Sequence, residues 1–581
     1  MSVTTAPREQ RVLRSDVPLG AFPDRVGDDL VRWGSERPER VFIAERSGEG
    51  WRTVTYMRAL QRVRAIAGAL LAIGGPDHPI AVIAENGIEH ALVVLAAMYV
   101  GIPVSALSVN YARADADPDR LRTLMDVLRP AAAFVPDPAM ADVVARAVHG
   151  LPVLTDAMAL RGDPALADEA FARIRPDTVA KVLFTSGSTG TPKGVITTHR
   201  MLCSNQTMLS QIWPEAVADP VLVDWAPWSH VASGNKCFGL VLRNGGTFYV
   251  DDGRPLPGAF DATLRNLRSI APTFYFNVPR GYALLADALE TDVPLATMFF
   301  SRVRVLLNAG AAIPEALRQR LAVLARRYAG RDVPVVSCWG ATETAPMATA
   351  VWGPNPAAPE TIGTPVPGVE IKLAPVEDRW EMRVRGPSVT PGYWRNVDAT
   401  DAAFDSEGFY KTGDAAELLD PDDPSRGIVF AGRISENFKL SSGTWVNVGA
   451  VRLATVEATA PLLDDVVVAG ADQDAIGVLA FLNLAAAREL TGLPQAERAE
   501  LIGHPAVHER LRALLAERNA RAGGSSARIA RVLLLADTPS GAEGEITDKG
   551  SLNQRRVLTR RAADVARLYT DPLDPEVLVL T

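Results

Sequence analysis

The sequence predicts an α/β protein with one large domain followed by a smaller one. Three observations support this prediction. The chain has 581 residues, which is more than one ordinary hydrophobic core holds. Short apolar runs that end in Gly or Ser alternate with helical patterns as far as about Phe430. After about residue 433 the pattern of apolar runs changes to that of a compact C-terminal segment. We therefore expect domains at 1–433 and 434–581.

The predicted elements follow one another in a regular order. The runs AVIAENG, KVLFTSG, RVRVLLNAG and VPVVSCWG predict strands, whereas IEHALVVLAAMYVG and PEALRQRLAVLARRYAG predict helices. Short strands with Gly and Pro turns between Thr361 and Phe430 indicate a small β subdomain. After Arg433, VVVAGADQDAIGVLAFLNL and RIARVLLLA predict strands, and residues 505–521 predict a helix. Ligands should bind at the carboxyl ends of the strands.

Composition excludes several classes of protein. Hydrophobic residues make up 48% and charged residues 22%, which are globular values and exclude a mainly disordered chain. The net charge of −8 provides no global positive field for nucleic acid or an anionic membrane. Three well-separated cysteines without a CxxC pattern fit neither a disulfide framework nor a zinc site, and they suggest a reducing compartment.

No segment of the sequence predicts export or a membrane span. The first twenty residues lack the apolar core of a secretory signal. The apolar stretch from Ala91 to Val109 contains Gly101 and Pro103 and is shorter than a span requires, so it predicts a buried helix followed by a buried strand. We therefore expect a soluble, cytoplasmic protein with no membrane partner.

Lysine is rare in this chain. It occurs at only seven positions (181, 193, 236, 372, 411, 439 and 549), so arginine accounts for 53 of the 60 basic residues. A drift toward arginine codons explains the average. Such drift should spare lysine mainly where a compact, flexible charge is needed, and each remaining lysine is a modest functional candidate.

The segment from Lys181 to Gly194, KVLFTSGSTGTPKG, carries the main chemical signal. An apolar strand ends in a loop with three glycines, four hydroxyl side chains and Lys193. Glycines let backbone N–H groups approach an anion, while hydroxyls and a lysine add donors and charge. The loop therefore predicts a triphosphate site, although it matches neither GxxxxGK[ST] nor GxGxxG.

This loop resembles the signature phosphate loop of the adenylate-forming superfamily of acyl-CoA synthetases, peptide-synthetase adenylation domains and luciferases. Further motifs follow in the family's order: Trp339-Gly340-Ala341-Thr342-Glu343, Thr412-Gly413-Asp414 and Gly432-Arg433. The resemblance covers essentially the whole chain. It implies a large N-terminal domain of layered α/β subdomains plus a small β subdomain, with a small mobile α+β C-terminal domain that carries Lys549.

The resemblance also implies a reaction. A carboxylate attacks the α-phosphate of ATP to give an acyl-adenylate and pyrophosphate, and the thiol of coenzyme A then takes the acyl group. Glu343 is the expected Mg²⁺ ligand, because a hard carboxylate suits that ion. Trp339 is expected to contact adenine, Asp414 the ribose hydroxyls, and Arg433 the ribose or a phosphate, or else to form a structural bridge. The expected nucleotide-binding set is Thr185, Ser186, Gly187, Ser188, Thr189, Gly190, Lys193, Gly310, Ala311, Ala312, Trp339, Gly340, Ala341, Thr342, Glu343, Asp414 and Arg433.

Two expectations concern the C-terminal part. The family places a catalytic lysine in a Pro-rich loop near the end; this chain reads SGAEGEITDKGSLNQRR, with no adjacent Pro, and Lys549 takes the role as the only lysine after Lys439. With Lys549, the expected catalytic residues are Glu343, Thr185 and Lys193. The hinge for domain rotation is expected at Ser435, where the family often has Asp or Lys.

The segments FKLSSGTWVNVG, GEITDKGSLNQR and APWSHVASGN resemble the feruloyl-CoA synthetase group, which implies an aromatic acid such as a hydroxycinnamate as the substrate. The implied acid pocket is apolar with few polar anchors. Its residues are His230, Val231, Ala232, Asn235, Phe238, Phe276, Asn277, Val278, Gly310 and Met347, with Ala311 and Ala312 beside Gly310. Ala232-Ser233 replaces a bulkier Phe-Gly of that group, which leaves salicylate or benzoate open.

Other classes of function share the same nucleotide residues. An adenylation enzyme that loads a carrier protein differs only in the acceptor of the acyl group. A non-catalytic nucleotide-binding paralogue is expected to lack Lys549 or Glu343, and both are present. Nothing in the sequence points to a luciferase-like oxygenase. We expect a monomer or a homodimer.

Overall fold

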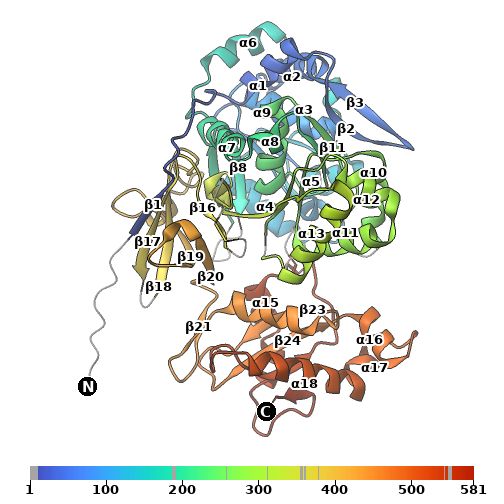
Figure 1. Cartoon of the computed structure of the whole chain (residues 1–581). Coiled ribbons are helices and arrows are strands. Elements are labelled where there is room, and N and C mark those ends of the chain that lie inside the picture. Colours follow the sequence, from blue (N-terminus) through green and yellow to red (C-terminus); the bar gives the residue numbers. More distant parts are fainter. Residues whose placement is uncertain are drawn as a thin grey trace. The chain divides into compact units, whose positions relative to one another are not determined.

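The computed structural model describes residues 11–185, 192–256, 258–310, 312–353, 357–358, 361–376, 379–541, 543–546 and 552–580. The chain forms two compact units. The first runs to Thr412 and includes Leu418–Val429, and the second comprises Gly413–Glu417 and the chain from Phe430 onward. The predicted α/β class, with a large N-terminal part and a smaller C-terminal part, is confirmed (Figure 1). The domain boundary at residue 433 stays a prediction.

A sheet with the strand order β7-β6-β4-β5-β8-β9 carries the predicted phosphate loop. Its inner strands are parallel and almost fully buried, as expected for strands covered by helices on both faces. The apolar stretch after Gly87 forms the buried helix α3 (Ile88–Tyr99) and then β5, as predicted. The other strands are β4 (Ile80–Val82), β5 (Val104–Ala106), β6 (Ala132–Phe134), β7 (Val153–Leu154), β8 (Val179–Thr185) and β9 (Lys193–Thr198).

Two further sheets complete the α/β layers of the first unit. One has the order β10-β11-β2-β3, and the other has the order β12-β13-β14-β15-β16. In the second of these, β12, β13 and β14 are parallel, so their carboxyl ends lie at one edge. The strands are β2 (Val41–Ser47), β3 (Gly50–Thr55), β10 (Val221–Asp224), β11 (Thr247–Val250), β12 (Phe274–Asn277), β13 (Val305–Asn308), β14 (Val335–Gly340), β15 (Met347–Ala350) and β16 (Thr364–Pro365).

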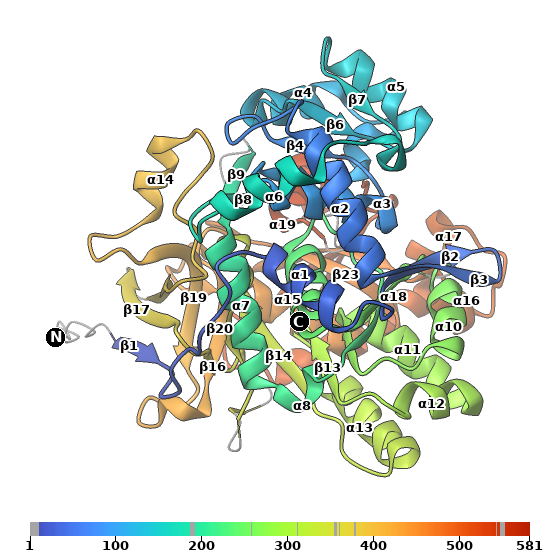
Figure 2. The same ribbon diagram turned by 90° about the horizontal axis from the view of Figure 1, so that it is seen from above.

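Helices cover these sheets. Figure 2 shows α10, α11, α12 and α13 gathered beside β13 and β14, where their apolar faces form one core with β12 and β13. This packing leaves the carboxyl ends of the strands for the loops that carry the predicted site. The main helices of the first unit are α1 (Gly27–Glu36), α2 (Tyr56–Leu70), α4 (Pro118–Leu128), α5 (Pro138–Ala147), α6 (Pro164–Arg173), α7 (His199–Ile212), α9 (Phe238–Asn244), α10 (Phe260–Ser269), α11 (Pro279–Thr291), α12 (Val293–Phe300) and α13 (Glu315–Ala329).

The predicted β subdomain is a sheet with the order β1-β17-β18-β19-β20. The N-terminal strand β1 (Arg11–Arg14) pairs antiparallel with β17 (Glu370–Val376), although more than 350 positions separate them in sequence (Figure 1). The remaining strands are β18 (Arg379–Arg385), β19 (Tyr410–Leu418) and β20 (Ile428–Arg433).

The second unit has its own core around a sheet with the order β23-β24-β25-β26. The run predicted as one strand after Arg433 forms two, β23 and β24, because the chain turns between them at Gly470 (φ +141°) and Asp472 (φ +59°). The main elements are α15 (Val448–Thr459), β23 (Leu463–Ala469), β24 (Ile476–Leu482), α16 (Leu484–Thr491), α18 (Pro505–Ala520), β25 (Ile529–Leu534), α19 (Gln554–Arg560) and β26 (Val577–Val579).

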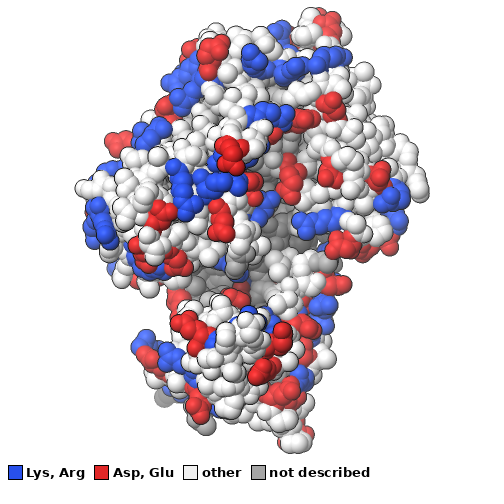
Figure 3. Space-filling model, turned by 90° about the vertical axis from the view of Figure 1, so that its right-hand side faces the viewer, with Lys and Arg blue, Asp and Glu red and all other residues white. Residues whose placement is uncertain are grey.

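The charged surface agrees with the modest net charge. On the face shown in Figure 3, Lys and Arg side chains are interspersed with Asp and Glu side chains. Many charged side chains of the protein pair; Arg320, for example, pairs with Asp287 and Glu290. Within the described ranges, no helix combines the length and the apolar character that crossing a bilayer requires.

Candidate functional site

The predicted phosphate loop joins two antiparallel strands. Thr185 ends β8, Lys193 begins β9, and the two residues pair directly across the hairpin. The pairing of β8 with β9 therefore fixes one residue at each end of the loop. Ser186, Gly187, Ser188, Thr189 and Gly190 lie outside the described residues.

A second segment, Thr390 to Asn396, lies along β9 and fixes the surroundings of Lys193. The N–H of Trp394 donates to the carbonyl of Gly194 (2.7 Å), and the N–H of Ile196 donates to the carbonyl of Gly392 (3.1 Å). This pairing brings the ring of Tyr393 beneath the lysine, with 5.2 Å between Lys193 Nζ and the ring centroid.

The Trp339-to-Glu343 motif forms a tight turn after β14. At Gly340 a Cβ atom would stand 1.7 Å from the carbonyl oxygen of Pro346, so the turn excludes any larger residue. Thr344 closes the turn, because its Oγ1 accepts a hydrogen bond from the N–H of Ala341 (2.8 Å). The carbonyl of Glu343 accepts from the N–H of Thr390 (2.8 Å), which ties the turn to the segment along β9.

The Glu343 side chain is buried and meets two tyrosines. Its Oε1 accepts a hydrogen bond from the hydroxyl of Tyr393 (3.1 Å), which in turn lies 3.2 Å from the hydroxyl of Tyr410. Burial, and next the neighbouring Glu343 carboxylate, raise the pKa of both phenols above their ordinary value. Both hydroxyls therefore stay protonated and available as donors.

The surroundings of Glu343 fit a magnesium ion. No cluster of three His, Cys, Asp or Glu side chains occurs in the part of the chain that the structure describes. Mg²⁺ does not require one, because it is commonly held by one or two carboxylates together with phosphate oxygens and water. A single buried carboxylate, oriented by a phenol, is a hard oxygen donor of that kind.

The first half of the predicted acid pocket includes a π-helical turn, Ala232–Cys237. Such turns leave backbone carbonyls without their usual helical partners and are frequent at functional sites. Lys181 Nζ donates to the carbonyl of Gly234 (2.7 Å) and to Oδ1 of Asn235 (3.0 Å). Gln206 donates to the carbonyl of Asn235 (2.8 Å), and Ser233 Oγ donates to Asp224 (2.5 Å). Three buried side chains thus hold this turn.

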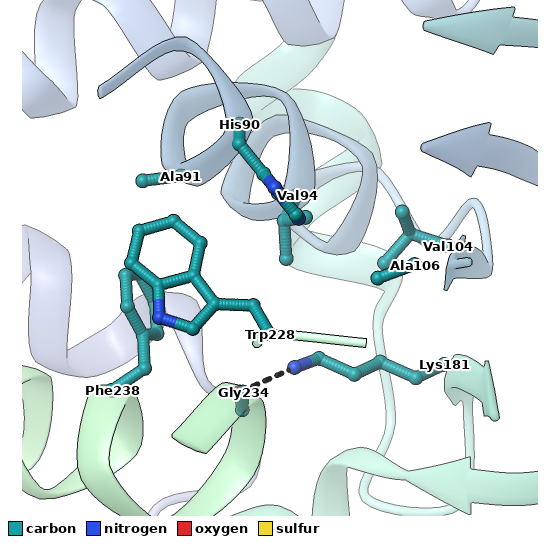
Figure 4. Close-up of a pocket in the computed structure, with 9 residues that line it drawn as sticks. All are labelled: His90, Ala91, Val94, Val104, Ala106, Lys181, Trp228, Gly234 and Phe238. Carbon is teal, nitrogen blue, oxygen red and sulfur yellow. Dashed lines mark hydrogen bonds between the residues drawn. The ribbon is translucent and has the colours of Figure 1, made fainter. Parts of the chain in front are cut away.

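Lys181 also faces a small cavity of about 10 Å³, which is room for a single water molecule. Figure 4 shows Lys181 on one side of it, with His90 and Trp228 from other elements. Burial lowers the pKa of Lys181 to about 7 and that of His90 to about 4. The cavity is too small for an organic acid. It lies beside the turn that Lys181 holds.

The other predicted pocket residues are distributed as follows. Phe238 packs in an aromatic cluster with Trp228 and Phe248. Asn277 is fully buried, and its amide bonds to Trp225, Tyr275 and the N–H of Val278. Val231, Asn235, Phe276 and Met347 are also buried, His230, Ala232 and Val278 are partly exposed, and Gly310 and Ala312 are exposed, while Ala311 lies outside the described residues.

Asp414 and Arg433 come together in the second unit. The Asp414 carboxylate is buried on β19, and its Oδ1 lies 3.5 Å from Nε of the exposed Arg433 at the end of β20. Ser435 occupies the exposed turn that follows, where the N–H of Glu436 donates to the carbonyl of Arg433 (3.1 Å).

Lys549 itself lies outside the described residues, but both ends of its loop are anchored. Ile546 and Leu552 form an antiparallel bridge. Glu545 is fully buried, and Arg561 donates to both of its carboxylate oxygens (2.7 and 2.9 Å). Burial raises the pKa of Glu545, but the hydrogen bonds that its carboxylate accepts, first of all those from Arg561, together lower it more, and the pKa falls to about 2. Glu545 therefore stays ionised and holds the start of the loop.

Sequence analysis did not identify Tyr393, Tyr410, Glu545 or Arg561. The rarity of lysine flagged Lys181 and Lys236 but gave neither a role. A tyrosine far from Glu343 in sequence carries no local pattern that could reveal the contact.

Two family models match the chain. The model of the family described as AMP-binding enzyme matches residues 30–394, and that of the AMP-binding enzyme C-terminal domain matches residues 439–572.

Two curated relatives are named as CoA ligases. Anthranilate–CoA ligase of Pseudomonas aeruginosa is 30% identical over 318 residues, which is 53% of this chain and 57% of that protein. The 3-[(3aS,4S,7aS)-7a-methyl-1,5-dioxo-octahydro-1H-inden-4-yl]propanoyl:CoA ligase of Rhodococcus jostii is 28% identical over 272 residues, which is 44% of this chain and 46% of that protein. The matched parts thus span about half the length of these relatives.

A solved structure shares the fold. It is the A-PCP didomain of carboxylic acid reductase from Segniliparus rugosus in complex with AMP, with a TM-score of 0.72 and 19% identity, and the match covers 94% of this chain and 82% of that one.

Proposed function

Since the chain belongs to the AMP-binding enzyme family, we propose that it activates an organic acid with ATP and transfers the acyl group to coenzyme A. The observation that carries this proposal is the convergence of Lys193 and Glu343 on one residue, Tyr393. A cation for the phosphates and a carboxylate for magnesium, both in contact with one tyrosine, are what a nucleoside triphosphate requires.

The proposed first step joins two anions. A carboxylate oxygen of the acid attacks the α-phosphorus, the bond from that phosphorus to the bridging oxygen breaks, and pyrophosphate leaves. Lys193 and the hydroxyl of Thr185 bind the departing phosphates, and Glu343 holds Mg²⁺, which offsets their charge. Lys549 is proposed to contact the acid and the α-phosphate. Catalysis here is mainly positioning and charge neutralisation.

In the proposed second step, the thiolate of coenzyme A attacks the acyl carbon, the carbon–oxygen bond to the phosphate breaks, and AMP leaves. We propose that rotation of the C-terminal part about Ser435 separates the two steps. The contact between Asp414 and Arg433 supports a ribose-binding role for that carboxylate, since a buried acid beside an exposed arginine suits a polar ligand.

For the substrate we propose an aromatic acid, with a hydroxycinnamate such as ferulate first and a salicylate or benzoate second. The similarity to an anthranilate–CoA ligase and the buried Phe238 and Phe276 support an aromatic acyl group. An apolar pocket with few polar groups is typical of such ligands.

The test is a coupled assay of acid-dependent AMP release over a panel of cinnamates, benzoates, salicylates and medium-chain fatty acids, with and without coenzyme A. We expect AMP and an acyl-CoA with at least one aromatic acid. Pyrophosphate exchange without acyl-CoA would instead indicate a carrier protein as the acceptor. No AMP with any acid would contradict the proposal.

A further inference from the structure

Lys236 is a buried lysine whose charge is not balanced within the described residues. Its side chain is 1% exposed. Its ammonium lies 3.9 Å from Sγ of Cys338 and 4.5 Å from the centroid of the Phe276 ring. A thiol is a weak acceptor, and a ring face accepts no conventional hydrogen bond. Three strong N–H donors are thus held without an oxygen acceptor among the residues that the structure describes.

Such a group is costly. Removing an ammonium from water without a hydrogen-bonded partner is strongly unfavourable, and buried donors in native proteins usually have acceptors. A cation–π contact offsets only a small part of this cost. The position persists because the turn that carries it is fixed by other residues: Lys181, Gln206 and Asp224 hold the three residues that precede Lys236.

The location of the ammonium suggests its partner. Phe276 lies near the carboxyl end of β12, and Cys338 precedes Trp339 near the carboxyl end of β14. Lys236 therefore reaches the edge of a parallel sheet at which ligands bind in this class of fold. The turn that carries Glu343 begins at the same edge.

We propose that Lys236 is a specificity residue for the acid, and that it binds an oxygen acceptor at the far end of the acyl group. This inference rests on the proposed function. The preferred acid then carries a second carboxylate, a phenolic oxygen or a carbonyl oxygen in addition to the carboxylate that is activated. A hard oxygen suits a compact ammonium, and an acid without it leaves the buried charge unpaired.

The experiment compares pairs of acids that differ by one distal oxygen group: benzoate with 4-hydroxybenzoate or terephthalate, cinnamate with 4-hydroxycinnamate, and hexanoate with adipate. The measured quantity is kcat/KM for AMP release with coenzyme A. We expect the wild-type protein to prefer the oxygen-bearing member of its best pair by roughly 10- to 150-fold, the value of a hydrogen bond to a charged group. The phenol and dicarboxylate members then distinguish between these two oxygen types.

The variant Lys236→Met should bring this ratio close to one, through a higher KM for the oxygen-bearing acid, while activity on the parent acid is retained. Its midpoint of thermal unfolding should stay the same or rise, because an unpaired buried charge is removed. Lys236→Arg keeps the charge and should keep part of the preference. Lys181→Met is the matched control, since it loosens the same turn and should lower kcat/KM for both members of a pair alike.

Three outcomes separate the possibilities. Equal loss of both acids in Lys236→Met, with a lower unfolding midpoint, would assign the lysine to the fold or to the reacting carboxylate and overturn the inference. A wild-type protein that turns over acids without a preference would overturn the inference and leave the proposed function intact. A wild-type protein that forms no AMP with any acid would overturn the proposed function and, with it, this inference.

Discussion

The hydroxyl of Tyr393 donates a 3.1 Å hydrogen bond to Oε1 of Glu343. The two residues are brought together because the segment around Tyr393 pairs with β9 at Val195, while its Thr390 holds the backbone of Glu343. The same tyrosine ring underlies Lys193. A phenol that stays protonated thus orients the carboxylate proposed to hold the metal.

Tyr393→Phe should weaken magnesium binding. The variant keeps the ring beneath Lys193 but removes the donor to Glu343, and loss of such an orienting hydrogen bond typically costs about 10- to 100-fold in metal affinity or activity. A Mg²⁺ titration of acid-dependent AMP release at saturating ATP measures the effect. Tyr249→Phe is the control, because that residue packs on Trp51 in β3, away from this site. A Mg²⁺ requirement equal to that of the wild type would show that the phenol does not orient a metal ligand.

Lys549→Ala should abolish adenylation and affect the second step far less. The reason is that its ammonium is proposed to balance charge between the acid and the α-phosphate, a need that ends once the adenylate has formed. The loss of adenylation is measured by pyrophosphate exchange, and the second step by thioester formation from a supplied adenylate. Equal losses in both assays would contradict this division of roles.

Ser435→Pro should spare adenylation and reduce overall CoA ligation. Proline fixes φ and restricts the residue before it, so a hinge at this position loses dihedral freedom. Ser435 is itself exposed, so the substitution replaces no buried side chain. Pyrophosphate exchange and acyl-CoA formation are compared in the same preparation. Ligation at the wild-type rate would place the hinge elsewhere.

Local pattern predicted much of the fold. The strands of the apolar runs and the helices at 88–101, 314–330 and 505–521 follow from periodicity, and the structure contains all of them. The hairpin of β23 and β24 was predicted as one strand, because both strands are apolar and a turn containing a left-handed Asp472 leaves little trace in hydropathy. The family match confirms the adenylate-forming resemblance, whereas the feruloyl type stays a proposal.

The site was harder to predict than the fold. Motif residues such as Lys193 and Glu343 carry local signals, but their common neighbour Tyr393 reaches them only through a long-range pairing with β9. The scarcity of lysine flagged Lys181 and Lys236. Only the structure shows that one of them holds the turn from which the other extends.

Lys181 makes the stability of the protein depend on pH in a defined window. Burial lowers its pKa in the folded state to about 7, against 10.5 for an ordinary lysine. Between these two values the unfolded chain binds more protons than the folded one, so the free energy of unfolding rises with pH across this window. The contribution is about 2 kcal/mol between about pH 7 and pH 9.

Lys181→Met removes this titration. The free energy of unfolding of the wild type minus that of the variant should therefore increase by about 2 kcal/mol from about pH 7 to pH 9. Urea denaturation at several pH values measures it. Lys411→Met, a lysine-to-methionine change at a half-buried position, is the matched comparison. A Lys181→Met difference that stays flat with pH would mean that this ammonium is not desolvated, and the assignment of Lys181 as the buried donor that holds the π-helical turn would be wrong.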